Sequence, residues 1–176
     1  YHFVTHLVDN LTSIASTEIR RHYIHLLKYW QKNNYLLIPI PLHQKRFNWR
    51  GFNQSALLAK KLAHNLKLKY SGQILFKTKY THPQAKLKNK RLRITNISDS
   101  FTVNTQRHSE LVSEPVLDLV QESHTDKSRP PKIILFDDVI TTGSTIKSAT
   151  KTLKTHGFKS IWALSPLTKI SPEDLG

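Results

Sequence analysis

The segment from Ile133 to Thr145 constrains the fold of this 176-residue chain more than any other. Four apolar residues, Ile133 to Phe136, predict a buried central strand of a parallel sheet. Two carboxylates, Asp137 and Asp138, follow directly, and after a short turn a helix is expected from Thr145. In open α/β sheets, ligands bind outside the carboxyl ends of the strands. The segment therefore predicts both an α/β sheet and a ligand site at its edge.

The turn between these carboxylates and the helix has the chemistry of an anion site. Free backbone N–H groups and the positive end of the helix dipole favour a phosphate there. Gly143 lets the backbone approach a ligand closely. Hydroxyl donors are supplied by Thr141, Thr142, Ser144 and Thr145. Asp137 and Asp138 repel a phosphate, but they accept hydrogen bonds from vicinal sugar hydroxyls or hold Mg²⁺ indirectly. One anionic end and one end rich in hydroxyls describe a ribose 5-phosphate.

Apolar residues elsewhere in the chain recur at helical or strand spacing, and the two patterns alternate. Helices are expected over residues 11–30, 53–66 and 145–156, and strands over 35–40, 74–76, 101–103, 132–136 and 160–167. A short helix is also expected around residues 112–120, with acidic side chains on a solvated face. Strands that alternate with helices favour a doubly wound, mostly parallel α/β sheet. We therefore expect one domain that spans residues 1–176.

Positive charge is concentrated in the first half of the chain. The formal net charge is +15, and residues 19–98 contain no Asp or Glu but 18 of the 27 Lys and Arg residues. Part of this excess lies in residues 77–95, which read as a long, polar, basic loop. Such asymmetry predicts a polyanionic partner. The absence of cysteine excludes disulfides, thiol catalysis and a cysteine-based zinc site within these residues.

Aromatic residues lie among these basic residues, which is typical of proteins that stack bases of single-stranded DNA. Trp49 and Tyr80, in loop-like contexts, are the best candidates, with Arg50 as a phosphate contact. An anionic membrane surface is the alternative polyanion, although no basic amphipathic helix favours it. No apolar run approaches the roughly 20 residues of a transmembrane segment. A cytoplasmic protein is expected, and a peripheral position at the inner face of the membrane stays open.

The segment from Ile133 to Thr145 is similar at every position to the phosphoribosyl pyrophosphate (PRPP) signature of type I phosphoribosyltransferases. This resemblance implies that Asp137 and Asp138 contact the ribose 2- and 3-hydroxyls. It also implies that the turn from Thr141 to Thr145, Gly143 included, binds the 5-phosphate. Mg²⁺ would be bound through PRPP, without a direct protein ligand.

Two further motifs resemble those of the ComF/ComFC competence protein family. The first is Pro39-Ile40-Pro41-Leu42-His43, then Arg46, then Arg50-Gly51-Phe52-Asn53-Gln54. The second is Pro83-Gln84-Ala85-Lys86-Leu87, followed by Arg91 and Asn96. Their order and spacing match the family from about Leu36 to Leu167. Members are linked to DNA uptake in natural transformation, and they usually carry an N-terminal four-cysteine zinc finger. We expect that module to be trimmed or absent here.

The resemblance implies roles for two basic segments. Residues 40–46 would form the pyrophosphate loop, with Pro41, Leu42, His43, Lys45 and Arg46 near the ligand. Residues 77–95 would form the flexible hood that closes over PRPP and excludes water. Its cations, which would face the pyrophosphate or DNA, are Lys86, Lys88, Lys90, Arg91 and Arg93.

Three functions follow as hypotheses. The first is a PRPP-binding, DNA-binding competence protein, with single-stranded DNA, PRPP and proteins of the competence machinery as partners. The second is a nucleobase phosphoribosyltransferase of nucleotide salvage, and the third is a non-catalytic regulator that senses PRPP. A transferase needs a pocket for its acceptor base, usually built after the final strand. Residues 168–176 are short and polar and contain no aromatic side chain, which disfavours the second hypothesis.

Overall fold

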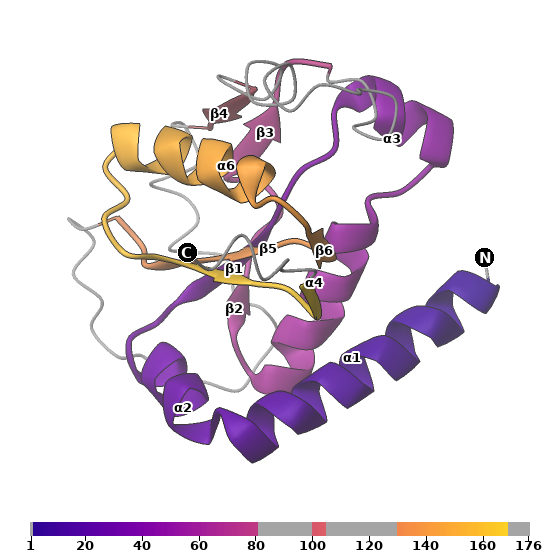
Figure 1. The fold of residues 1–176 in the computed structure, drawn as a ribbon, viewed down its shortest axis with the longest axis vertical. Helices are drawn as coiled ribbons and strands as arrows, with labels where there is room; N and C mark the ends of the chain where they lie inside the picture. Colours follow the sequence, from indigo (N-terminus) through magenta and orange to yellow (C-terminus); the bar gives the residue numbers. More distant parts are fainter. Residues whose placement is uncertain (1, 81–99, 105–129, 169–176) are drawn as a thin grey trace.

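A four-stranded parallel sheet forms the centre of the molecule (Figure 1). The computed structural model describes residues 2–80, 100–104 and 130–168. The strand order is β2-β1-β5-β7, with β1 at Leu36–Pro39, β2 at Lys69–Tyr70, β5 at Ile133–Phe136 and β7 at Ile161–Leu164. Every residue of β1 and β5 is buried, as expected for inner strands covered on both faces. The prediction of a mostly parallel α/β sheet is thus confirmed.

Helices cover both faces of this sheet (Figure 1). One face packs against α1 (His2–His22), α2 (Ile24–Lys32) and α4 (Gln54–Leu66). The other packs against α6 (Ser144–Thr155) and a two-stranded antiparallel unit of β3 (Leu75–Lys77) and β4 (Phe101–Val103). Side chains alternate between these two cores along each strand. In β5, for example, Ile134 and Phe136 face the first core, and Ile133 and Leu135 face the second.

The single helix predicted over residues 11–30 is two helices in the structure. The chain turns at Tyr23 (φ −126°, ψ 29°), although the Leu27 N–H still donates to the Tyr23 carbonyl at 2.9 Å. The turn lets α2 run under the sheet, where Leu27 and Trp30 are buried, while α1 stays along α4 (Figure 1). Apolar residues keep helical spacing across this turn, so the sequence pattern does not predict a break between α1 and α2.

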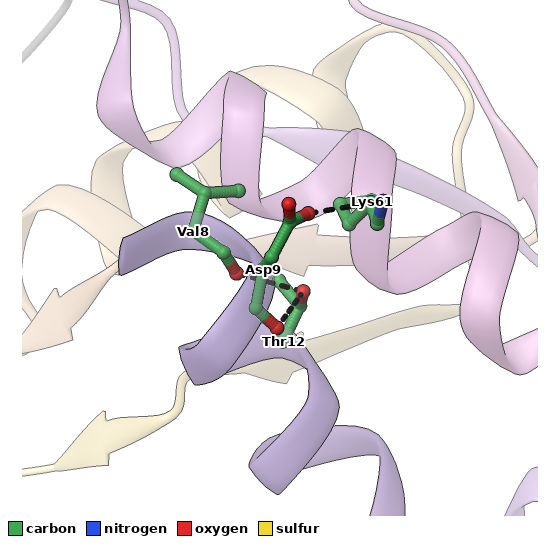
Figure 2. Close-up of polar contacts among 4 residues, drawn as sticks. All are labelled: Val8, Asp9, Thr12 and Lys61. Carbon is green, nitrogen blue, oxygen red and sulfur yellow. Dashed lines mark hydrogen bonds and ion pairs between the residues drawn. The ribbon is translucent and has the colours of Figure 1, made fainter. Parts of the chain in front are cut away.

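Polar contacts hold α1 against α4 (Figure 2). Asp9 of α1 and Lys61 of α4 form an ion pair at 3.0 Å. Within α1, the buried Thr12 hydroxyl beside this pair donates to the Val8 carbonyl at 2.8 Å, so it needs no partner on α4. Further along, the Arg20 guanidinium donates to the Asn65 carbonyl. An exposed ion pair contributes only about 0–1 kcal/mol, so apolar packing dominates this contact.

The final strand predicted over residues 160–167 is shorter and is followed by a second piece. After β7 the chain makes β8 (Leu167–Thr168), which pairs in parallel with β6 (Val139–Ile140). This pairing brings the chain after β7 beside the chain after β5, where Ser165 donates to the Asp138 carbonyl at 3.3 Å. Within the part of the chain that the structure describes, no helix has the length and apolar content to span a membrane. The short helix predicted around residues 112–120 lies outside the described residues.

Candidate functional site

A polar pocket of about 240 Å³ opens at the carboxyl ends of β1 and β5. Three regions line it: the chain from the end of β1 through α3 (Gln44–Arg50) to the start of α4, the end of β3, and the turn after β5. The lining residues are Ile40, Pro41, Leu42, Arg46, Arg50, Asn53, Gln54, Ser55, Lys77, Asp137, Asp138, Val139, Thr141 and Thr145. The pocket thus contains the acid pair, two residues of the predicted phosphate turn and four of the predicted pyrophosphate loop.

Asp137 and Asp138 lie together where β5 ends, and Ser55 of α4 bridges them. The Ser55 hydroxyl lies 3.2 Å from Asp137 Oδ1 and 3.1 Å from Asp138 Oδ1. The Asp138 N–H donates to Asp137 Oδ1 at 3.1 Å. Burial and the neighbouring charge of Asp138 raise the pKa of Asp137 from 3.8 to about 7. The Asp137 carboxyl is therefore partly protonated at neutral pH.

Ser55 was not among the predicted site residues, although one signal identifies it. It is buried and lies on the same helical stripe as Leu58, Ala59 and Leu62, at steps of three, four and seven. A hydroxyl on the apolar stripe of a helix needs a polar partner. Here the partners are two carboxylates that are more than 80 residues away in the sequence.

The predicted phosphate turn leads into α6 and includes its first two residues, Ser144 and Thr145. Its backbone is left-handed at Gly143. Gly143 has φ 67°, and a Cβ built there meets no atom within 4 Å. Glycine is therefore required by backbone conformation in the described structure, not by a close neighbour. Gly143, the N-cap residue of α6, makes no side-chain cap bond, but the Ser144 N–H donates to Thr142 Oγ1 at 3.5 Å. The Thr142 and Ser144 hydroxyls bond each other at 2.9 Å. A shallow depression adjoins the pocket here, lined by Asp137 and residues 139–146.

The predicted pyrophosphate loop is partly helical. Pro41, Leu42 and Arg46 line the pocket, whereas His43 and Lys45 do not. His43 instead caps α3, because its Nδ1 accepts a hydrogen bond from the Lys45 N–H at 3.1 Å.

The start of α4 is tied to the end of β1. The Asn53 side chain donates to the Ile40 carbonyl at 3.0 Å and makes no capping bond to α4. This bond fixes the segment that contains Arg50 and Gln54, both of which line the pocket.

The DNA-contact candidates lie beside the pocket. Trp49 on α3 is 82% exposed. The Tyr80 ring contacts the His43 ring with a centroid distance of 5.4 Å, and Lys45 Nζ lies 5.8 Å from its centre. The hood cations Lys86, Lys88, Lys90, Arg91 and Arg93 lie outside the described residues.

Lys77 lines the pocket, although the sequence suggested only that it begins the basic loop. It ends β3 opposite Phe101 of β4, and its Nζ lies 5.4 Å from the centre of that ring. Burial and the nearby Arg46 charge lower the pKa of Lys77 from 10.5 to about 8, and Asp137 partly opposes that shift. One sequence signal could have identified Lys77 as a site residue: it directly follows the apolar residues of a strand, as the acid pair does after β5.

Comparison with known proteins identifies relatives, although no family model matches the chain. It is 29% identical over 131 residues to Competence protein F of Haemophilus influenzae, covering 73% of this chain and 49% of that protein. It is 30% identical over 130 residues to DNA utilization protein YhgH of Salmonella typhi, covering 73% and 48%. It is also 31% identical over 130 residues to Competence protein ComFC of Bacillus subtilis, covering 74% and 42%.

The chain thus spans about half the length of the curated relatives it matches. The matches to both competence proteins agree with the motifs from Pro39 to Gln54 and with a mostly parallel α/β sheet. On this evidence the chain belongs to the ComF/ComFC family of competence proteins.

Proposed function

We propose that this domain binds PRPP together with Mg²⁺. The observation that carries the proposal is one pocket lined by an acid pair, a hydroxyl-bearing turn at a helix N-terminus, and two arginines. PRPP has the matching groups in a row: a 5-phosphate, two vicinal ribose hydroxyls and a pyrophosphate on C1.

The acid pair suits the ribose. Ionised carboxylates accept hydrogen bonds from hydroxyl groups, and Asp137 and Asp138 lie side by side, as the 2- and 3-hydroxyls do. Ser55 limits the rotation of both carboxylates, because its hydroxyl touches each of them. A pre-positioned pair loses less entropy when the ligand binds.

The turn and the arginines suit the two phosphorylated ends. The turn from Thr141 to Thr145 precedes the 12-residue helix α6, whose first N–H groups favour an anion. Arg46 and Arg50 line the pocket and would offset the charge of the pyrophosphate. Mg²⁺ would be held by pyrophosphate oxygens and would reduce the same charge, without a direct protein ligand.

We also propose a competence-related role in which the domain binds single-stranded DNA. Relatives named for competence and for DNA utilization motivate this part. The exposed Trp49 on α3 lies next in sequence to Arg50, and the half-exposed Tyr80 lies beside Lys45. An exposed ring flanked by cations suits base stacking combined with phosphate contacts.

Proteins of the competence machinery are further proposed partners. The proposed location is the cytoplasm, where PRPP is formed and used.

Two titrations test these proposals. Isothermal calorimetry should show that PRPP binds in the presence of Mg²⁺, and the absence of binding would refute the first proposal. Labelled single-stranded DNA should bind at low salt, with an affinity that falls steeply as salt rises. If DNA fails to bind at low salt, the second proposal is wrong.

The same assays separate the two alternatives. A nucleotide formed from PRPP and a nucleobase would identify a phosphoribosyltransferase. Binding of PRPP without a nucleotide product and without DNA binding would identify a PRPP-sensing regulator.

A further inference from the structure

Lys77 has a fixed position on the wall of the pocket. Its strand, β3, is paired with β4, and two bonds close the pair: Thr78 N–H to the Ser100 carbonyl at 2.9 Å and Asn104 N–H to the Ile74 carbonyl at 3.0 Å. Ser100 is fully buried, so this closure is part of the core. The backbone of Lys77 is therefore held by hydrogen bonds at both ends of the β3–β4 pair.

The Lys77 ammonium has no anionic partner among the described residues. Its nearby charges are Arg46, which repels it, and Asp137, which attracts it without forming an ion pair. Retaining a half-buried cation beside another cation is costly unless an anion compensates for it. The aliphatic part of Lys77 could pack over Phe101 with its ammonium in solvent, and the pKa would then keep its ordinary value. The pKa of Lys77 is instead lowered to about 8, so the ammonium is partly buried on the pocket wall, which packing alone does not require.

The pocket and the adjoining depression indicate which anionic group of a ligand would compensate the Lys77 charge. The shallow depression at the turn is lined by Asp137 and residues 139–146, and Lys77, Arg46 and Arg50 do not line it. The main pocket contains those three cations and shares Asp137 with the depression. With the 5-phosphate at the turn and the ribose at the acid pair, the group that remains to face Lys77 is the one on C1.

We propose that Lys77 is a specificity-determining residue, which contacts the C1 pyrophosphate and so selects PRPP over ribose 5-phosphate. This inference rests on the proposed PRPP site. It assigns the discrimination to a lysine of β3 acting with Arg46 and Arg50, independently of any cation in residues 81–99.

Substitution of Lys77 tests this directly. We expect Lys77→Met to weaken PRPP binding by roughly 10- to 100-fold, as for loss of one charge-assisted hydrogen bond, and ribose 5-phosphate binding by less than about 2-fold. Lys77→Arg should retain PRPP affinity within about 3-fold, because it keeps the charge. The control is Lys79→Met, which removes an exposed lysine that does not line the pocket and should leave both affinities unchanged.

A pH series adds a readout that a structural role would not change. Wild-type PRPP affinity should fall as pH rises above about 8, where Lys77 loses its proton, while Lys77→Arg shows no such fall. The charged groups that face Lys77 are Arg46 of α3 and Asp137 after β5. Asp137 titrates near pH 7, so it does not produce a fall above pH 8.

The possible failures are distinguishable. If wild type binds no PRPP, the proposed function itself is wrong. If wild type binds PRPP and Lys77→Met binds it equally well, or loses both ligands to the same degree, only the role of Lys77 is overturned. Thermal unfolding verifies that each variant is folded, and Lys77→Gln replaces Lys77→Met should the latter aggregate.

Discussion

The two ends of the parallel sheet differ in how their polar groups are satisfied. At the amino end, the buried Tyr35 hydroxyl bonds Ser160 at 2.7 Å and accepts from Trp162 Nε1 at 3.2 Å. Lys132 there donates to Asn33 at 2.7 Å. At the carboxyl end, two carboxylates share one hydroxyl, and a lysine lies near an arginine.

This difference indicates which polar groups stabilise the fold and which are available to a ligand. The Tyr35, Ser160 and Trp162 groups at the amino end bond one another, and each bond stabilises the folded chain by about 1 kcal/mol. At the carboxyl end, burial and a neighbouring like charge raise the pKa of Asp137 to about 7 and lower the pKa of Lys77 to about 8, and both effects destabilise the free protein. Such arrangements are frequent at binding and catalytic sites.

The largest expected effect is at the carboxyl end. Replacing both Asp137 and Asp138 with Asn should weaken PRPP binding by about a hundredfold or more, because the carboxyl acceptors for the ribose hydroxyls become neutral amides. Calorimetry in the presence of Mg²⁺ measures the PRPP affinity, and circular dichroism verifies that the variant is folded. If PRPP affinity survives the double substitution, the acid pair is not the ribose site.

Asp137→Asn alone should stabilise the protein. The folded-state pKa of Asp137 lies above the ordinary value, so the folded protein retains a proton that the unfolded chain loses, and stability falls as pH rises from about 4 to about 7. At pH 8 the variant should be more stable by on the order of 2 kcal/mol, and at pH 4 the two should match. Urea denaturation at both pH values measures this difference, with Asp9→Asn, at a half-exposed carboxylate outside the pocket, as control. An unchanged pH dependence would contradict the assigned pKa shift.

Trp49→Ala tests the surface beside the pocket. Loss of one stacking ring should weaken binding of single-stranded DNA by roughly 5- to 30-fold and leave PRPP affinity unchanged. Fluorescence anisotropy with a labelled oligonucleotide measures it. Trp162→Phe is the matched control, since Trp162 is a half-exposed tryptophan at the amino end of the sheet. Equal losses of DNA affinity in both variants would exclude a specific role for Trp49.

The smallest effect is expected at the amino end. Tyr35→Phe removes the hydroxyl that serves Ser160 and Trp162 and should lower the free energy of unfolding by about 1 kcal/mol. Affinities for PRPP and DNA should not change, because the site lies at the opposite ends of the strands. A loss of ligand affinity would show that the two ends are coupled.

Sequence patterns predicted the parts of the site that are contiguous in the chain. β5, the acid pair and the turn before α6 form one local signature, and the strand and helix follow as expected. The short helix α3 was not expected because it buries no side chain and therefore has no apolar stripe. Its ends depend on the His43 cap and on Gly51, whose φ is 78°.

Residues that reach the site from other elements were not predictable in this way. Ser55 and Lys77 lie on α4 and β3, and their roles depend on contacts with residues far along the chain. Amphipathic periodicity identifies which face of an element is buried, but it does not identify the partner of a polar group on that face.

The pairing of β1 with β5 sets the distance between the two walls of the pocket. Four consecutive pairs run from Leu36↔Ile133 to Pro39↔Phe136, and the Ile40 N–H continues the ladder to the Phe136 carbonyl at 2.8 Å. Both loops therefore leave the sheet at the same level, separated by one interstrand spacing of roughly 4.8 Å. The span between the carboxylates and the segment with Arg46 is thus a property of the main chain. Loop side chains can change between relatives without altering the length of ligand that fits.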